Sequence, residues 1–215
     1  MSKVAITGNA SGTGVFTVAS PNSNTDRVLT LPDETGTVLT GVSSLVAGNL
    51  TGSVPTSAMP AGSVIQVVQA FKTDTAVHAS SSYTDISGLV VTITPSSATN
   101  KILVMFNVQA TCNTNTVQLR ITRNGTEVGI ADAASSRVRT TVGAYWPTTD
   151  ANHQSFPFSA CFLDSPSTIS ELTYKIQVKS QDGVNVFINR SANDADNSDW
   201  GMRSTSNITL MEIAG

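Results

Sequence analysis

The stretch from Leu29 to Gly62 constrains this chain most, because it is too apolar for a linker and too short to fold alone. Only Asp33 and Glu34 are charged in it, and its ten large apolar residues are Leu29, Leu31, Val38, Leu39, Val42, Leu45, Val46, Leu50, Val54 and Met59. A disordered linker rarely carries so many large apolar side chains, and a separate domain needs more chain to bury them. We therefore expect the stretch to pack against copies of itself or against a larger assembly.

Composition favours β structure over the rest of the chain. Charged residues make up 13% of the 215 residues, about half of the usual share of about 25%. Val, Ile and Thr, which suit the pleated and half-buried surface of a sheet, are frequent. No segment keeps a 3.6-residue period, so we expect almost no helix.

The charge and hydropathy patterns exclude several classes of function. The net charge is −3, the pI is about 5.2 and no basic block occurs, which argues against nucleic-acid binding. No apolar run approaches the ~20 residues that a membrane helix needs, and the N-terminus lacks the apolar core of a secretory signal. We expect assembly in a cytoplasm, where Cys112 and Cys161 are free, strand-buried thiols rather than a disulfide.

Two phrases in the first third of the chain resemble a known family. VASPNSNTDRVLTLPDETGTVLT resembles a module near the start of tailed-bacteriophage fibre and appendage proteins, and NLTGSVPTSAMPAGSV resembles the shaft-to-head connection of such fibres. The likeness covers about residues 14–68. It implies a homotrimer that projects from the virion, in which residues 1–62 form an extended, interlocked β stem. Stem assembly would depend on Leu29, Leu31, Val38, Leu39 and Leu50.

Dense strand patterns follow the Pro- and Gly-containing boundary at residues 59–62. Roughly ten strands at a spacing of 8–12 residues are typical of a sandwich or barrel. We expect them at 63–71, 86–94, 101–110, 116–123, 128–130, 137–146, 154–163, 171–179, 184–188 and 207–213. The continuous apolar run KILVMFNVQA at 101–110 predicts a central strand that is buried on both faces.

Residues 63–215 resemble the trimeric jelly-roll heads of the C1q and tumour-necrosis-factor class. The likeness is carried by the KILVMFNV strand, the LRITRNGTEV hairpin, the LTYKIQVKSQDG strand and turn, and the closing ITLMEI strand. It implies an all-β chain in which an extended stem is followed by a jelly-roll β-sandwich head.

Side chains that could carry chemistry are few, and we expect no catalytic residues and no cofactor. His78 and His153 are the only histidines, and Ser155 and Asp150 near His153 lack the context of a nucleophile. Asp194, Asp196 and Asp199 form an oxygen-rich run that could bind Ca²⁺, but the spacing lacks the Gly and Glu of an EF-hand loop. The alternative is a solvated acidic turn without a metal.

Tyr145, Trp146 and His153 are candidates for receptor contact, because aromatic residues in the loops of a sandwich bind sugars and proteins well. The alternative is that these aromatic side chains fill the core or line the axis of a trimer.

These patterns predict a non-enzymatic structural protein of the virion, a trimeric phage fibre or spike that mediates host attachment. Its partners would be other virion proteins of the tail or capsid, bound through the stem, and a host surface glycan or protein. A capsid decoration or head-fibre protein that stabilises the shell is the alternative. A glycan-cleaving spike is a third reading, which would require a pair of catalytic carboxylates.

Charged substitutions in the stem test its predicted role. Replacing both Leu31 and Leu39 with Asp should abolish assembly, because buried unpaired carboxylates are costly. Size measurement of the full chain checks this, with Thr35→Asp in the intervening turn as a control. An oligomer unchanged by the double substitution would contradict the stem reading.

Overall fold

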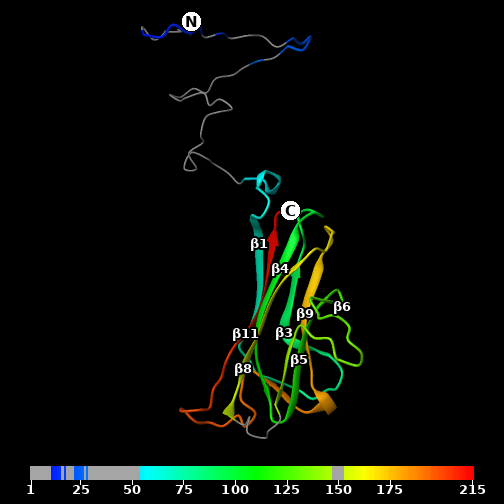
Figure 1. Ribbon diagram of the computed structural model, residues 1–215. Helices are drawn as coiled ribbons and strands as arrows, with labels where there is room; N and C mark the ends of the chain where they lie inside the picture. The colour runs from blue at the N-terminus through cyan, green and yellow to red at the C-terminus, as the bar shows by residue number, and fades with distance from the viewer. Residues whose placement is uncertain (1–10, 16, 18–21, 27, 29–53, 147–152) are drawn as a thin grey trace. The chain divides into compact units, whose positions relative to one another are not determined.

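The computed structural model describes residues 11–15, 17, 22–26, 28, 54–146 and 153–215 (Figure 1). Contacts divide the chain into two compact units, Met1–Thr51 and Gly52–Gly215. The five candidate stem-assembly residues, Leu29, Leu31, Val38, Leu39 and Leu50, lie outside the described residues. In the described part, no helix has the length and apolar character to cross a membrane.

The second unit begins before the boundary that the sequence indicated at residues 59–62. A 3₁₀ helix, η2 (Thr56–Ala58), precedes the first strand. The backbone amide of Gly62 donates to the carbonyl of Ala214 at 2.8 Å, and the amide of Ala214 donates to the carbonyl of Ser63 at 2.9 Å. Residues just before the first strand are therefore tied to the C-terminal end of the same unit.

The second unit is all-β, as the sequence predicts, and its described residues form eleven strands. They are β1 (Val64–Lys72), β2 (Ala76–His78), β3 (Thr84–Ile93), β4 (Lys101–Cys112), β5 (Asn115–Arg123), β6 (Thr126–Val128), β7 (Val142–Trp146), β8 (Phe156–Asp164), β9 (Leu172–Lys179), β10 (Val186–Ile188) and β11 (Ser206–Ile213). A second 3₁₀ turn, η4 (Gln181–Gly183), joins β9 to β10.

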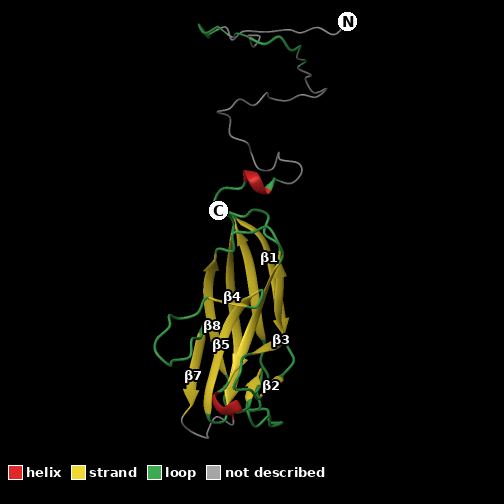
Figure 2. Ribbon diagram, turned by 90° about the vertical axis from the view of Figure 1, so that its right-hand side faces the viewer, coloured by secondary structure: helices red, strands yellow, loops and turns green. Residues whose placement is uncertain are grey.

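The eleven strands form two antiparallel sheets that pack as a β-sandwich (Figure 2). In the first sheet, β1, β11, β4 and β8 lie in that order. Beyond the start of β11, β10 pairs with the same edge of β4, and β2 pairs with β10 in the position that β1 has beside β11. In the second sheet the order is β3, β9, β5 and β7, and β6 lies beyond β7 on the same edge of β5. The eight main strands thus pair from the outside inward: first with last, second with seventh, third with sixth and fourth with fifth.

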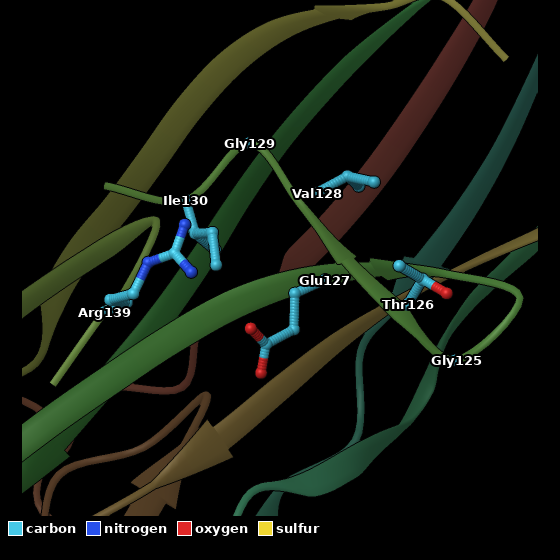
Figure 3. Close-up of a pocket in the computed structure, with 7 residues that line it drawn as sticks. All are labelled: Gly125, Thr126, Glu127, Val128, Gly129, Ile130 and Arg139. Carbon is cyan, nitrogen blue, oxygen red and sulfur yellow. The ribbon is translucent and has the colours of Figure 1, made fainter. Parts of the chain in front are cut away.

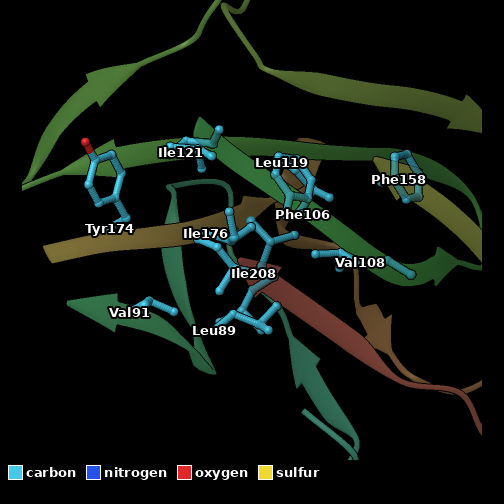
Figure 4. Close-up of a cluster of buried hydrophobic side chains, with 14 of the residues drawn as sticks. Leu89, Val91, Phe106, Val108, Leu119, Ile121, Phe158, Tyr174, Ile176 and Ile208 are labelled. Atoms are coloured by element: carbon cyan, nitrogen blue, oxygen red, sulfur yellow. The ribbon is translucent and has the colours of Figure 1, made fainter. Parts of the chain in front are cut away.

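The core lies between the sheets and is supplied by alternate residues of each strand (Figure 4). On β4 the side chains of Ile102, Val104, Phe106 and Val108 are buried, whereas Leu103, Met105 and Asn107 are partly exposed. Tyr174, Ile176 and Val178 of β9 face the buried residues of β4 from the second sheet and are fully buried. Period-2 burial of this kind is what β-strands impose on their side chains. β4 is central, as the sequence predicts, but the expected burial on both of its faces is wrong for the single chain.

The turn after β5 has the backbone conformation that its Asn-Gly sequence predicts. Asn124 and Gly125 both have positive φ, at 49° and 82°, which the two central residues of a type I′ hairpin turn require. The return strand β6 ends at Val128.

The expected strand at 137–146 begins only at Val142, because a turn closed by the Arg137 amide and the Ala134 carbonyl precedes it. Sequence analysis missed β2, which carries His78 in a segment expected to be a loop.

A buried carboxylate links three segments near the C-terminal end of the sandwich. Glu212 is fully buried on the inner face of β11. It accepts hydrogen bonds from the Asn100 side chain at 2.6 Å, from the Gln66 side chain at 2.6 Å, and from the Ser96 amide and hydroxyl at 2.6 and 2.8 Å. Burial alone would raise the pKa of Glu212, but these hydrogen bonds outweigh it and hold the pKa below its usual value.

The Glu212 network makes the stability of the fold depend on pH. Since the folded pKa is lowered, its contribution is complete above the ordinary Glu pKa and is lost as pH falls through the folded value. Glu212→Gln should lower the free energy of unfolding at pH 7 by about 1–3 kcal/mol and flatten its decline between pH 7 and 3.

Urea denaturation at a series of pH values measures this effect. Glu171→Gln removes an exposed carboxyl just before β9 and serves as the matched control, with a profile close to that of the unaltered protein. Equal profiles for Glu212→Gln and the unaltered protein would contradict the assignment.

Candidate association surface

The outer face of the first sheet presents apolar and uncharged polar side chains that do not belong to the core. The term outer face refers to the outward residues of β1, β4, β8 and β11. These are Val67, Gln69, Phe71, Leu103, Met105, Asn107, Ser159, Cys161, Leu163, Asn207, Thr209 and Met211. Their neighbours along each strand are the side chains that point into the core.

Strand register aligns these residues into rows across the sheet. One row is entirely apolar and runs from Val67 through Met211 and Leu103 to Leu163. Val67 and Leu163, at its ends, are 53% and 47% exposed. An apolar row across four strands has no role in the fold of a single chain, since the core lies on the other side of the sheet.

The next two rows are polar but uncharged. Gln69, Thr209, Met105 and Cys161 form one of them, and the Gln69 side chain donates to the Thr209 hydroxyl at 2.7 Å. The other row begins with Phe71, which is 57% exposed, and continues with Asn207, Asn107 and Ser159. The Asn107 side chain donates to the Ser159 hydroxyl at 2.9 Å. These polar groups satisfy one another within the sheet and leave the outer face without charge.

The outer face of the second sheet has the opposite character. Asp85 accepts hydrogen bonds from Lys175 at 2.7 Å and from Gln177 at 2.6 Å. The Arg120 guanidinium pairs with Glu127 and lies 3.9 Å from the ring centroid of Tyr83. Exposed ion pairs of this kind suit contact with water. The contrast between the two sheets therefore singles out the first sheet as the one that a partner would cover.

Among the described residues, side chains of the first sheet that point outward are buried at the end of the sheet away from Ile213. Phe187 and Thr111 are paired residues that point outward, yet they are 7% and 0% exposed. The Arg190 guanidinium lies 4.5 Å from the ring centroid of Phe187. The uncovered outer face therefore occupies the part of the sheet nearer the C-terminus.

The two cysteines are free, as the sequence predicts, but only one is buried. Cys112 on β4 is fully buried, and burial raises the pKa of its thiol to about 11. Cys161 on β8 is exposed on the outer face. The expectation that both thiols are buried within strands is therefore wrong for Cys161 in the single chain.

Strand register places the candidate receptor-contact residues at the end of the head away from Ile213, because Tyr145 and Trp146 pair with the start of β5 and His153 precedes the start of β8. Tyr145 of β7 is 63% exposed. Trp146 is the last residue of β7, and its side chain lies outside the described part. The ring of His153 contacts Trp200, with centroids 4.0 Å apart and an interplanar angle of 60°. The contact with Trp200 is an addition that the sequence did not reveal.

The calcium candidates are not brought together as a ligand set. Both carboxylate oxygens of Asp194 are engaged by arginines, with Arg203 at 2.8 Å and Arg190 at 3.4 Å. Among the described residues, no group of three or more His, Cys, Asp or Glu side chains, including Asp196 and Asp199, could hold a metal ion.

The residues near His153 that the sequence raised as a possible nucleophilic site lie only partly within the described residues. In the described part, the Ser155 hydroxyl is buried and has no hydrogen-bond partner, and Asp150 lies outside that part. An open hollow beside the β5–β6 hairpin is lined by Glu127, Gly129 and Arg139 among others (Figure 3). Glu127 is paired with Arg120, and the Arg139 Nε donates to the Ala131 carbonyl at 2.6 Å. The charges of this hollow are thus used within the chain.

No protein-family model matches the chain, and a search of curated proteins finds no relative with significant sequence similarity.

Proposed function

We propose that this protein is a non-enzymatic structural protein of a tailed-bacteriophage virion. In this proposal it is a homotrimeric fibre or spike whose N-terminal stem attaches to the tail or capsid and whose head mediates host attachment. The single observation that carries the proposal is the uncharged, partly apolar outer face of the first sheet, together with the stem phrases of the sequence.

The order of the strands supports a jelly-roll head. Pairing of eight main strands from the outside inward, divided between two four-stranded sheets, is the arrangement of a jelly roll. The likeness to trimeric heads rested on four sequence phrases, and those phrases lie in β4, β5–β6, β9 and β11. The observed strand order therefore supports the architecture that this likeness implied.

The chemistry of the outer face supports association with identical copies. Removing apolar surface from water stabilises an interface by roughly 25 cal/mol per Å². Identical side chains of three copies also approach one another around the axis of a trimer, where like charges would repel at a cost. The outward residues defined above carry no charge, and Lys101, at the start of β4, is marginal to them. Such a face can contact other copies of the chain without repulsion between like charges.

The entry of the chain and the candidate receptor-contact loops lie at opposite ends of the head, as a projecting module requires. Residues 54–62 enter at the end of the sandwich where the chain terminates, and the loops that carry His153 and Trp200 lie at the other end (Figure 1). In a trimer, three copies of a weak binding loop gain avidity through effective concentration. Host attachment would not require a deep pocket in each subunit.

Mutation of the apolar row tests the proposed trimer. Leu163→Asp should convert the full chain from a trimer into smaller species, because the row cannot bury a carboxylate without a large desolvation cost. Val90→Asp is the matched control: Val90 is 40% exposed on the second sheet, opposite Lys175. Light scattering coupled to size separation gives the mass, and a monomeric unaltered chain would overturn the proposal.

Cys161 reports whether the outer face is covered. In the assembled protein at pH 8, iodoacetamide should modify Cys161 at least about tenfold more slowly than in the Leu163→Asp variant, because only the thiolate in contact with solvent reacts. Cys112 should stay unmodified in both, since it is buried and its thiol pKa is about 11. Rapid modification of Cys161 in the unaltered protein would place the contact elsewhere.

Location on the particle separates a fibre from a capsid decoration protein. Electron microscopy of virions with the protein labelled should show density on the tail or on a projecting fibre, and loss of the protein should abolish adsorption. A weakened shell with intact adsorption would favour the decoration alternative.

A further inference from the structure

The loop at residues 189–206 is an excursion from what could have been a continuous strand. Ile188 of β10 pairs with Ala110, and Asn207 of β11 pairs with Asn107, so that only two residues of β4 separate these partners. The chain leaves the sheet between Ile188 and Asn207, although the sheet itself does not need the excursion. Long loops on a rigid scaffold are where binding residues concentrate.

Buried polar residues close the base of the loop. The Ser206 hydroxyl donates to the Asn189 side-chain oxygen at 2.6 Å, and the Asn189 side chain donates to the carbonyls of Lys72 and Asp74 at 3.0 and 2.9 Å. The Ser204 amide donates to the Asn189 carbonyl at 3.1 Å. A loop closed in this way leaves and rejoins the sheet at fixed positions.

Further contacts order the loop beyond its base. Asp194 is held between Arg190 and Arg203, and the Asn197 side chain accepts from the amides of Asp199 and Trp200 at 2.8 and 3.2 Å. The backbone is therefore fixed on both sides of the position that carries Trp200.

The ordered loop presents an aromatic pair to solvent. Trp200 is 38% exposed although it is a large apolar side chain. His153, which precedes β8, contacts it through ring centroids 4.0 Å apart. Because β8 and the β10–β11 line flank β4 on opposite sides, this contact joins two segments across the width of the sheet. The indole is thus held in place before any ligand arrives, which lowers the entropic cost of binding.

We infer that the Trp200–His153 pair is a binding platform for a neutral carbohydrate, with the indole stacking on the C–H face of a pyranose ring. An aromatic face carries negative potential and attracts the weakly positive C–H groups of a sugar. Asp196 and Asp199 belong to the same loop as Trp200, and both are exposed. Carboxylates in that loop can accept hydrogen bonds from hydroxyls but would repel an anionic ligand. This inference rests on the proposed role in host attachment and names the class of receptor.

An oligosaccharide array tests the inference with the full-length protein. The array carries neutral glycans of glucose, galactose, mannose and N-acetylglucosamine, together with sialylated and sulfated glycans. Unaltered protein should bind at least one neutral glycan, and Trp200→Ala should weaken that binding about tenfold or more, as loss of a central aromatic contact does. Trp200→Phe should retain part of it, and His153→Ala should cause a smaller loss because it only orders the indole.

The controls separate this inference from the proposed function. Ile169→Ala removes an exposed apolar side chain between β8 and β9 and should leave binding unchanged. Masses are measured for every variant, so that an intact trimer that binds no glycan, or only anionic glycans, overturns the platform while the proposed assembly stands. If the Trp200→Ala variant binds the neutral glycan as tightly as the unaltered protein does, the proposed platform is also overturned.

A second arm tests a protein receptor. On a bacterial strain to which the protein adsorbs, periodate, which cleaves vicinal diols of sugars, should abolish adsorption, whereas proteinase K should not. Sensitivity to the protease alone would overturn the carbohydrate assignment.

Discussion

A sandwich of two sheets covers only one face of each sheet, and this geometric limit governs the rest of the head. The inner faces supply a continuous apolar core, from Ile102 and Val104 on one side to Tyr174 and Ile176 on the other. The outer face of the second sheet meets water with ion pairs such as Lys175–Asp85. The outward residues that define the outer face of the first sheet form no such ion pairs, and among the described residues its apolar row from Val67 to Leu163 is partly exposed at both ends. Our proposal of a trimer follows from that imbalance.

Much of the fold could be predicted from the sequence because strands have a strict period of two. The alternation in 172–179 and the Asn124–Gly125 turn each gave a local signal that the fold confirms. Other elements depend on distant contacts. Residues 137–141 alternate as a strand does, but a local turn takes them out of the sheet. The short strand β2 forms only because β10 lies beside it, and its own three residues carry too little signal.

The candidate sites were harder to predict than the strands. The apolar run at 101–110 predicted burial on both faces, but Leu103 and Met105 are partly exposed in the single chain and lie on the outer face. The partner strands of these residues, and hence the row, could not be read from sequence because register depends on pairing across the whole chain. The same holds for Trp200, whose contact with His153 joins loops far apart in sequence. By contrast, the acidic run at 194–199 offered a possible metal site, but Arg190 and Arg203 of the same loop pair with Asp194.

Pairing of the first strand with the last has a consequence for how the protein is made. Residues 64–72 are synthesised before the rest of the head, but their partner strand at 206–213 is the last strand of that unit. The first sheet therefore cannot close until residues 206–213 have been synthesised, and contacts of such long sequence separation form slowly. Until then the apolar strands are exposed to aggregation, as in other slow β-sheet proteins. Association of copies through the first sheet has to follow synthesis of β11, and a nascent chain that stalls before residues 206–213 would yield no competent subunit.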